Sequence, residues 1–178
     1  NKDGSENTIA VQVTNKQPSS RWYSGSGIYR DVTLSYRDKV HVAEHGNHIT
    51  TPKLAQQKDG NVETQIQSKI KNSAKTLAKV FVEQQIFTKE GKAVSDLVRS
   101  VTKTLSGNET ADFKQTFLVN KPTLWTTKSY NPQLYVLKTK VYNEGQLVDV
   151  TEDTFGYRYF NWTAKDGFSL NGERMKFH

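Results

Sequence analysis

The sequence predicts an all-β fold, an immunoglobulin-like antiparallel β-sandwich of about seven strands. Apolar residues alternate with polar ones along nearly every apolar stretch, and a period of two is typical of half-buried antiparallel strands. Short segments containing Gly, Asn or Asp interrupt these stretches at brief intervals, as expected of turns. About seven strands within residues 38–158 would suit a sandwich of roughly 100 residues or somewhat more.

The expected strands follow this alternation in chain order. The first clear one places on a single face Val62, Thr64, Ile66, Ser68 and Ile70. Residues 77–87, 111–119 and 135–141 alternate in the same way, although both faces of residues 77–87 are partly apolar. The segments that break the strands are Lys58-Asp59-Gly60-Asn61, Lys89-Glu90-Gly91-Lys92, Ser106-Gly107-Asn108 and Asn143-Glu144-Gly145-Gln146.

Residues 93–105 are the ambiguous element of the pattern. Helical spacing is shared by Val94, Leu97, Val98, Val101 and Leu105. Val98, Thr102 and Thr104 are β-branched, however, and such residues are enriched in strands. We therefore expect a strand here, with a helix as the alternative.

Two aromatic pairs lie beside turns made by Pro122 and Pro132. They are Leu124-Trp125 and Leu134-Tyr135, which we interpret as anchors packed in the core; an exposed platform for sugar stacking is the alternative. Tyr135 stands near the start of a late strand, so it is a candidate for a tyrosine corner whose hydroxyl bonds to nearby backbone.

The last element is a predicted hairpin. Asn171-Gly172 separates residues 168–170 from residues 173–177, and a two-residue Asn-Gly loop suits a type I′ turn.

The first 36 residues carry a different signal. Residues 21–32 combine Trp22 and Tyr23, a flexible Ser-Gly run at 24–27, two arginines and Asp31. The Ser-Gly run predicts a tight turn, and residues 28–34 then alternate as a strand. Aromatic faces beside a fixed charge at the lip of a sheet commonly bind sugars, whereas a rigid turn with buried aromatics is the plainer interpretation.

Composition excludes several classes of function. The 178 residues contain no cysteine, which removes disulfide frameworks, thiolate metal sites and cysteine nucleophiles. No run of 18 apolar residues is present, so no membrane-spanning helix is expected. The net charge of +7 comes from 25 basic residues scattered among 18 acidic ones, which argues against a nucleic-acid partner.

Several motifs, taken in their order along the chain, resemble family 2 glycoside hydrolases, specifically bacterial β-galactosidases. The stretches that carry the resemblance are residues 7–13, residues 20–34, Pro122-Thr123-Leu124-Trp125, Asn131-Pro132-Gln133-Leu134-Tyr135, Gly156-Tyr157-Arg158 and Gly167-Phe168-Ser169-Leu170-Asn171-Gly172-Glu173. The resemblance divides the chain into three parts. Residues 1–36 would end a jelly-roll sugar-binding domain, 37–158 would form the sandwich, and 159–178 would lead into a catalytic (β/α)8 barrel. Two strands in residues 1–36 are too few for an independent fold, so we expect them to be disordered or to pair with an exposed edge.

The resemblance also implies a chemistry. Family 2 enzymes cleave a glycosidic bond with retention, using two carboxyl groups about 5–5.5 Å apart. It places both catalytic glutamates beyond His178, so no catalytic residue is expected in this chain; Glu83, Glu109 and Glu152 match no barrel motif.

Asp31 is the one site residue that the resemblance carries over. In the intact enzyme it would help to bind the galactose hydroxyls and a sodium ion, and Mg²⁺ is a further expected ion. A surface ion pair with Arg30 or Arg37 is the alternative for Asp31. The implied partners are the jelly-roll domain, the barrel, a β-galactoside and a second copy of the chain.

A different class of function stays open at this point. A non-catalytic carbohydrate-binding or adhesive module of a bacterial surface protein would use exposed aromatics, namely Trp22, Tyr23, Trp125 and Trp162.

His41, His45 and His48 lie close together, but Gly46-Asn47 between them and the lack of clustered carboxylates favour a solvated segment over a metal site. Bacterial cytoplasm and cell surface are both compatible with the sequence.

Overall fold

The computed structural model describes residue 4 and residues 8–16, 27–128 and 132–176. The chain forms two units, Asn1–Tyr36 and Arg37–His178, each of which is considered by itself. The larger unit is almost entirely β, which confirms the predicted fold class.

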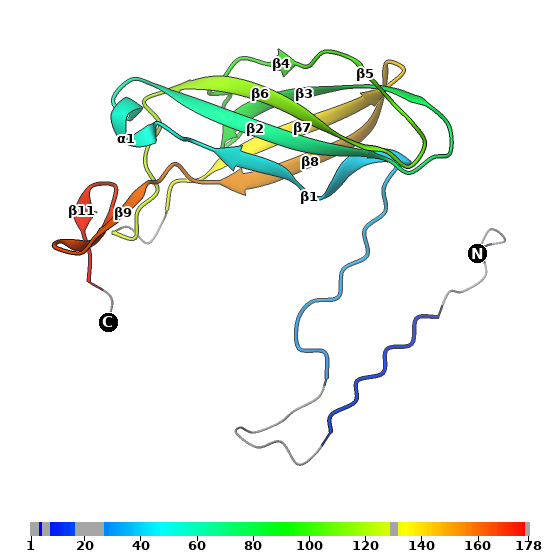
Figure 1. Ribbon diagram of the computed structural model, residues 1–178, viewed down its shortest axis with the longest axis horizontal. Helices are drawn as coiled ribbons and strands as arrows, with labels where there is room; N and C mark the ends of the chain where they lie inside the picture. Colours follow the sequence, from blue (N-terminus) through cyan, green and yellow to red (C-terminus); the bar gives the residue numbers. More distant parts are fainter. Residues whose placement is uncertain (1–3, 5–7, 17–26, 129–131, 177–178) are drawn as a thin grey trace. The chain divides into compact units, whose positions relative to one another are not determined.

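Eleven strands and one short helix are formed by the described residues (Figure 1). In chain order they are β1 (Val40–Thr50), α1 (Leu54–Gln57), β2 (Asn61–Asn72), β3 (Ala78–Thr88), β4 (Val98–Arg99), β5 (Lys103–Leu105), β6 (Thr110–Asn120), β7 (Tyr135–Asn143), β8 (Gln146–Phe155), β9 (Phe160–Thr163), β10 (Gly167–Leu170) and β11 (Glu173–Arg174).

Two antiparallel sheets face each other to make the sandwich (Figure 1). The first has the order β1-β2-β6, and the second has the order β4-β3-β7-β8 with β5 also paired to β3. Because β4 and β5 are two short pieces of one edge, the sandwich contains seven strands in the sense that the sequence predicted. The expected alternation is equally clear: along β2 the inward residues from Val62 to Ile70 are buried, and Lys69 and Lys71 are exposed.

Residues 93–105 are extended, so the strand prediction is confirmed over the helical alternative. Ala93 bridges Phe87, β4 pairs with β3, and β5 pairs with β3 again further along. Where the strand is interrupted, serine hydroxyls accept the hydrogen bonds of β3 backbone N–H groups. Ser95 Oγ accepts a hydrogen bond from Ile86 N–H, and Ser100 Oγ accepts one from Val82 N–H.

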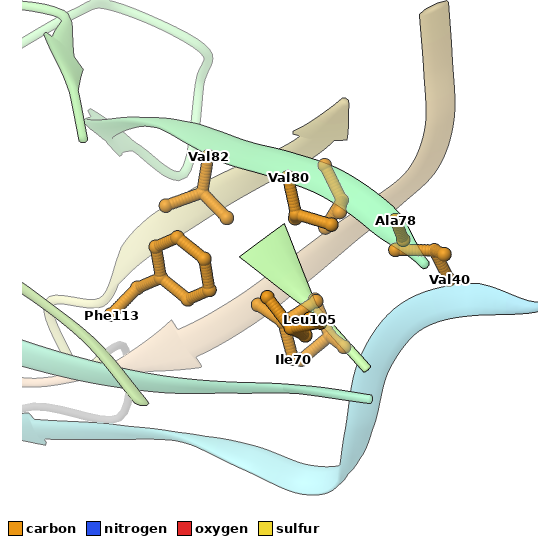
Figure 2. Packing of buried hydrophobic residues seen from close by; sticks show 9 residues of the cluster. Val40, Ile70, Ala78, Val80, Val82, Leu105 and Phe113 are labelled. Atoms are coloured by element: carbon orange, nitrogen blue, oxygen red, sulfur yellow. The ribbon is translucent and has the colours of Figure 1, made fainter. Parts of the chain in front are cut away.

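The core between the sheets consists of two apolar clusters. The first contains Val40, Val42, Ile70, Ala78, Val80, Val82, Leu105, Phe113 and Val141 (Figure 2). The second contains Leu54, Val62, Ile66, Ile86, Phe117, Val119, Tyr135, Leu137 and Tyr157. Full burial of each large side chain contributes about 1.5–3 kcal/mol.

A set of polar side chains, which we name the polar belt, lies between the two clusters. Its members are Asn47 of β1, Ser68 of β2, Gln84 of β3 and Thr139 of β7. The Gln84 amide donates to Ser68 Oγ (2.9 Å) and to Thr139 Oγ1 (2.8 Å), and Ser68 Oγ donates to Asn47 Oδ1 (2.5 Å). Gln84 Oε1 itself is buried without a partner among the described residues. The belt therefore links the two sheets by hydrogen bonds through the middle of the core.

Asn47 enters the belt because β1 is bulged. The pairing of β1 with β2 shifts between Val42 and Asn47, and His45 within the bulge has φ +50°. Gly46 cannot carry a side chain here, since a Cβ would lie 2.7 Å from Ala43 O and 2.9 Å from Lys69 O. The bulge turns the Asn47 amide inward, where it donates to Asp153 Oδ2 (2.6 Å).

Tyr135 forms the predicted tyrosine corner at the start of β7. Its hydroxyl accepts a hydrogen bond from Thr123 N–H at 2.9 Å, which ties the β6–β7 connection to the core.

The predicted hairpin also forms, as part of a small sheet with the order β11-β10-β9. Ser169 pairs with Arg174 and Leu170 with Glu173, which leaves Asn171-Gly172 as a two-residue loop. Both loop residues have positive φ, +52° and +84°, as a type I′ turn requires.

The described residues of Asn1–Tyr36 form no strand, so the strand expected at 28–34 is wrong for this chain. Apolar residues there are exposed, among them Ile28, Val32 and Leu34. A strand gains stability only from a ladder and a covered face, and the described part of this unit supplies neither. Whether these residues pair with another surface stays a prediction.

Candidate functional site

The structure describes only some of the predicted site residues of the first unit. Asp31 is exposed, with no hydrogen bond to other described residues of its unit. Arg30 lies over the Tyr29 ring, 5.4 Å from its centroid, instead of pairing with Asp31, and Arg37 donates to Val42 O. Trp22 and Tyr23 fall outside the described residues, so their roles stay predictions.

A cation site is not built by this chain's described side chains. They contain no group of three or more His, Cys, Asp or Glu residues arranged to hold a metal ion. Among the histidines, His41 Nδ1 lies 2.7 Å from Asp38 O, and His45 occupies the β1 bulge. Asp31 offers one carboxylate, whereas a magnesium ion is bound by several oxygen ligands, so the described side chains do not form a cation site by themselves. The sodium and magnesium ions implied for the intact enzyme stay a prediction.

The three glutamates considered above have structural contacts. Glu83 receives two hydrogen bonds from Arg99, at 2.6 and 3.0 Å, and one from the Tyr142 hydroxyl. These bonds, that from Arg99 above all, hold the pKa of Glu83 below its usual range, whereas a general acid needs a raised pKa. Glu152 pairs with Lys138, and Glu109 accepts a hydrogen bond from the backbone of the preceding turn.

Another buried ionisable group lies in the core, at Tyr157. Its hydroxyl is 2.9 Å from Thr64 Oγ1, and burial raises the pKa of Tyr157 well above its ordinary value. The phenol therefore stays protonated and acts as a hydrogen-bonding core residue.

The junction between the sandwich and the hairpin sheet gathers the motifs that the sequence singled out. A pocket of about 370 Å³ opens there, lined by Trp125, Leu134, Thr154, Phe155, Gly156 and Arg158. Arg158 lies over the indole of Trp125, 4.8 Å from the ring centroid. A Cβ on Gly156 would lie 2.9 Å from Trp125 Cβ, so the glycine allows the close approach.

Trp125 is thus partly buried and covered on one side. This agrees with the anchor interpretation and leaves little room for a sugar to stack on that face. Sequence reasoning missed the partnership with Arg158 and Gly156, because those residues lie more than 30 positions further along the chain. Their presence in one short motif, Gly156-Tyr157-Arg158, was the available signal.

The hairpin sheet carries an aromatic face, defined by Phe160, Trp162 and Phe168. Trp162 is opposite Phe168 in the β9–β10 pairing, and their rings are 5.6 Å apart. Phe160 and Trp162 remain 70% and 69% exposed. No helix among the described residues is long and apolar enough to cross a membrane.

Comparison with known proteins places these features in a family. The sequence profile described as "Glycosyl hydrolases family 2" matches residues 40–158, which span β1 to the end of β8 and the Gly156-Tyr157-Arg158 motif. The chain belongs to glycosyl hydrolases family 2.

Two curated relatives of the family 2 chain are similar over nearly its whole length. The β-galactosidase BoGH2A of Bacteroides ovatus is 35% identical over 96% of this chain, which covers 19% of that protein. A putative β-glucuronidase of Formosa agariphila is also 35% identical over 96% of the chain, which covers 15% of it. The chain thus spans less than a fifth of either relative.

Solved structures agree on the fold. A family 2 β-glucuronidase superimposes with a TM-score of 0.69 at 18% identity, over 80% of this chain and 15% of that one. A family 2 member from Bacteroides cellulosilyticus gives a TM-score of 0.68 at 27% identity, over 79% of this chain and 18% of its own.

Proposed function

We propose that this family 2 chain is the structural, immunoglobulin-like domain of a bacterial β-galactosidase. In that role it holds a jelly-roll sugar-binding domain, with Asp31 near its end, against the catalytic barrel. The supporting observation is the coincidence of the family match, residues 40–158, with the two-sheet sandwich, together with the small share of each relative that the chain covers.

The physical case for a spacer is the stiffness of the sandwich. Its sheets are linked through the polar belt, its β6–β7 connection is tied to Tyr135, and its β7–β8 loop is a two-residue turn at Glu144-Gly145. Catalysis depends on reacting groups held in fixed geometry, and a misplacement of 1 Å can cost about a hundredfold in rate. A domain with few internal degrees of freedom suits the task of holding two others in place.

The choice of galactoside over glucuronide rests on the run Ile28-Tyr29-Arg30-Asp31-Val32 and on the similarity to BoGH2A. The similar glucuronidases make a β-glucuronide the competing substrate. Asp31 would bind the sugar hydroxyls and a sodium ion in the intact enzyme, and Trp22 is the candidate for stacking on the sugar. Mg²⁺ and a homo-oligomer are further proposals for the intact enzyme.

The test compares this chain with the longer gene product that contains it. We expect the longer protein to release nitrophenol from p-nitrophenyl β-galactoside faster than from the β-glucuronide, and the 178-residue chain to release none from either. Asp31→Asn in the longer protein should lower kcat/KM, while Asp38→Asn serves as the matched control. Hydrolysis by the short chain, or faster cleavage of the glucuronide, would refute the corresponding part of the proposal.

The exposed aromatic face favours a second candidate, a carbohydrate-binding module. Aromatic side chains presented on a sheet can stack on sugar rings, and Phe160 and Trp162 are both exposed. Titration of the chain with galactose and lactose distinguishes the two. Saturable binding at millimolar or lower concentration that is lost in Trp162→Ala would favour the module, whereas an unchanged fluorescence signal favours the spacer.

A further inference from the structure

The hairpin sheet is joined to the sandwich through the side chain of Asn171. Asn171 Nδ2 donates to Trp125 O at 2.8 Å, across 46 residues of sequence. Asn171 Oδ1 accepts a hydrogen bond from Tyr159 N–H at 3.2 Å, and Asn171 N–H donates to Tyr159 O at 2.8 Å. This one residue of the hairpin loop is thus hydrogen-bonded to Tyr159, which directly precedes β9, and to the β6–β7 connection of the sandwich.

A backbone hydrogen bond within the sandwich holds the segment to which Asn171 bonds. Trp125 N–H donates to Tyr157 O at 2.8 Å, so the backbone at Trp125 is fixed against the end of the sandwich before Asn171 bonds to its carbonyl. Tyr157 is buried in the second apolar cluster, and Trp125 is held by Gly156 and Arg158. Asn171 therefore bonds to a backbone group that the sandwich holds in a fixed position.

Few residues could replace Asn171. Its φ of +52° lies in the left-handed region, which Asn, Asp and Gly tolerate best. The position also requires a donor and an acceptor on neighbouring atoms, because Trp125 O accepts and Tyr159 N–H donates. Asp would keep the acceptor but lose the donor, and Gly would lose both.

Other links between the hairpin and the sandwich are less directional. Lys128 pairs with Glu173, but both side chains are more than half exposed, and such exposed pairs contribute little to stability. Tyr159 packs against the second cluster, which brings the hairpin close through an apolar contact without hydrogen bonds that set an angle. The Asn171 amide is part-buried and supplies directed bonds.

We propose that Asn171 is a positioning residue, whose side-chain amide fixes the orientation of the hairpin sheet, and with it the aromatic face, relative to the sandwich. The proposal builds on the spacer function, since a fixed hairpin would set the direction in which the polypeptide enters the next domain. It is nevertheless a statement about this chain alone and can be tested without any substrate.

The experiment measures residual dipolar couplings of backbone amides in the 178-residue chain. In the unaltered chain, couplings from β9–β11 should fit the alignment tensor determined from β1–β8. In Asn171→Gly and Asn171→Asp they should no longer fit that tensor, while the couplings within β1–β8 still do. Glu144→Gly is the matched control, because Glu144 holds the same loop position in the β7–β8 hairpin with φ +50°. It should leave all couplings on one tensor.

Hydrogen exchange of backbone amides distinguishes the acceptor role of Asn171 Oδ1 from the donor role of Asn171 Nδ2. The Tyr159 amide should exchange about tenfold faster in Asn171→Gly, which removes its acceptor, and at nearly the original rate in Asn171→Asp. A single tensor for the whole larger unit in both variants would overturn the proposal. Failure of the longer protein to cleave galactosides would refute the proposed function and leave this result untouched.

Discussion

Tyr135→Phe removes one oxygen atom and tests whether the tyrosine corner stabilises the sandwich. The Tyr135 side chain is 5% exposed, and its ring packs edge-on against Tyr157 with centroids 4.9 Å apart. Phenylalanine keeps that packing, so the change isolates the 2.9 Å hydrogen bond from Thr123 N–H. Loss of the acceptor leaves a part-buried N–H unpaired, which costs about 1–2 kcal/mol. For a unit of this size that corresponds to a fall in Tm of roughly 3–6 °C.

Urea unfolding followed by circular dichroism measures this difference. Tyr36→Phe is the control, because Tyr36 is 98% exposed and its variant should unfold within about 0.3 kcal/mol of the unaltered chain. If Tyr135→Phe were as stable as Tyr36→Phe, with an unchanged urea slope, the Thr123 bond would contribute nothing and the reasoning would be refuted.

Three further changes probe the bulge, the junction and the edge. Gly46→Ala should destabilise the sandwich by about 2–4 kcal/mol in urea, because the new Cβ would meet two backbone oxygens within 3 Å. Gly156→Ala should push the Trp125 indole away from Arg158, which alters its near-ultraviolet circular dichroism and costs about 1–3 kcal/mol. The pKa of Glu83 lies below its ordinary 4.5, so its contribution to stability is present above that pH and is lost as the pH falls through the folded-state pKa. Glu83→Gln should therefore narrow the difference in urea midpoint between pH 7 and pH 3.

Each of these changes has a matched control. Gly60→Ala is the control for both glycines, since a Cβ there would meet only Gln57 O at 3.8 Å, and an equal loss in all three variants would contradict the steric argument. Glu152→Gln alters an exposed ion pair with Lys138 and should keep the pH difference of the unaltered chain. If Glu83→Gln kept the same difference, the Arg99 contact would not be a source of acid sensitivity.

The strands could be predicted because one side of each sheet is buried. Thr64 and Ser68 were placed on the inward face by their spacing from Ile66, and both are fully buried. The partner of each polar residue could not be predicted. Gln84 bonds to Ser68 and Thr139 across strand pairings that no local pattern encodes. The bulge at Gly46 could not be predicted from local sequence either, since it depends on the approach of the Lys69 backbone from β2.

The candidate site was predicted less completely than the fold. The Asn171-Gly172 turn follows from backbone preferences of two adjacent residues, and it was predicted correctly. The bond from Asn171 to Trp125 depends on tertiary structure, and the sequence offers no local sign of it. Asp31 was assigned by resemblance and Trp22 by its aromatic side chain beside the Ser-Gly turn, and both roles stay predictions.

The polar belt has a consequence for how the two sheets can be aligned. Layers that met only through Val and Ile could slip by one pleat, because each methyl group would find another in the new position. Slippage here would place the amides of Asn47 and Gln84 against hydrocarbon, at a cost of several kcal/mol. The belt thus opposes sliding of one sheet over the other and fixes their alignment.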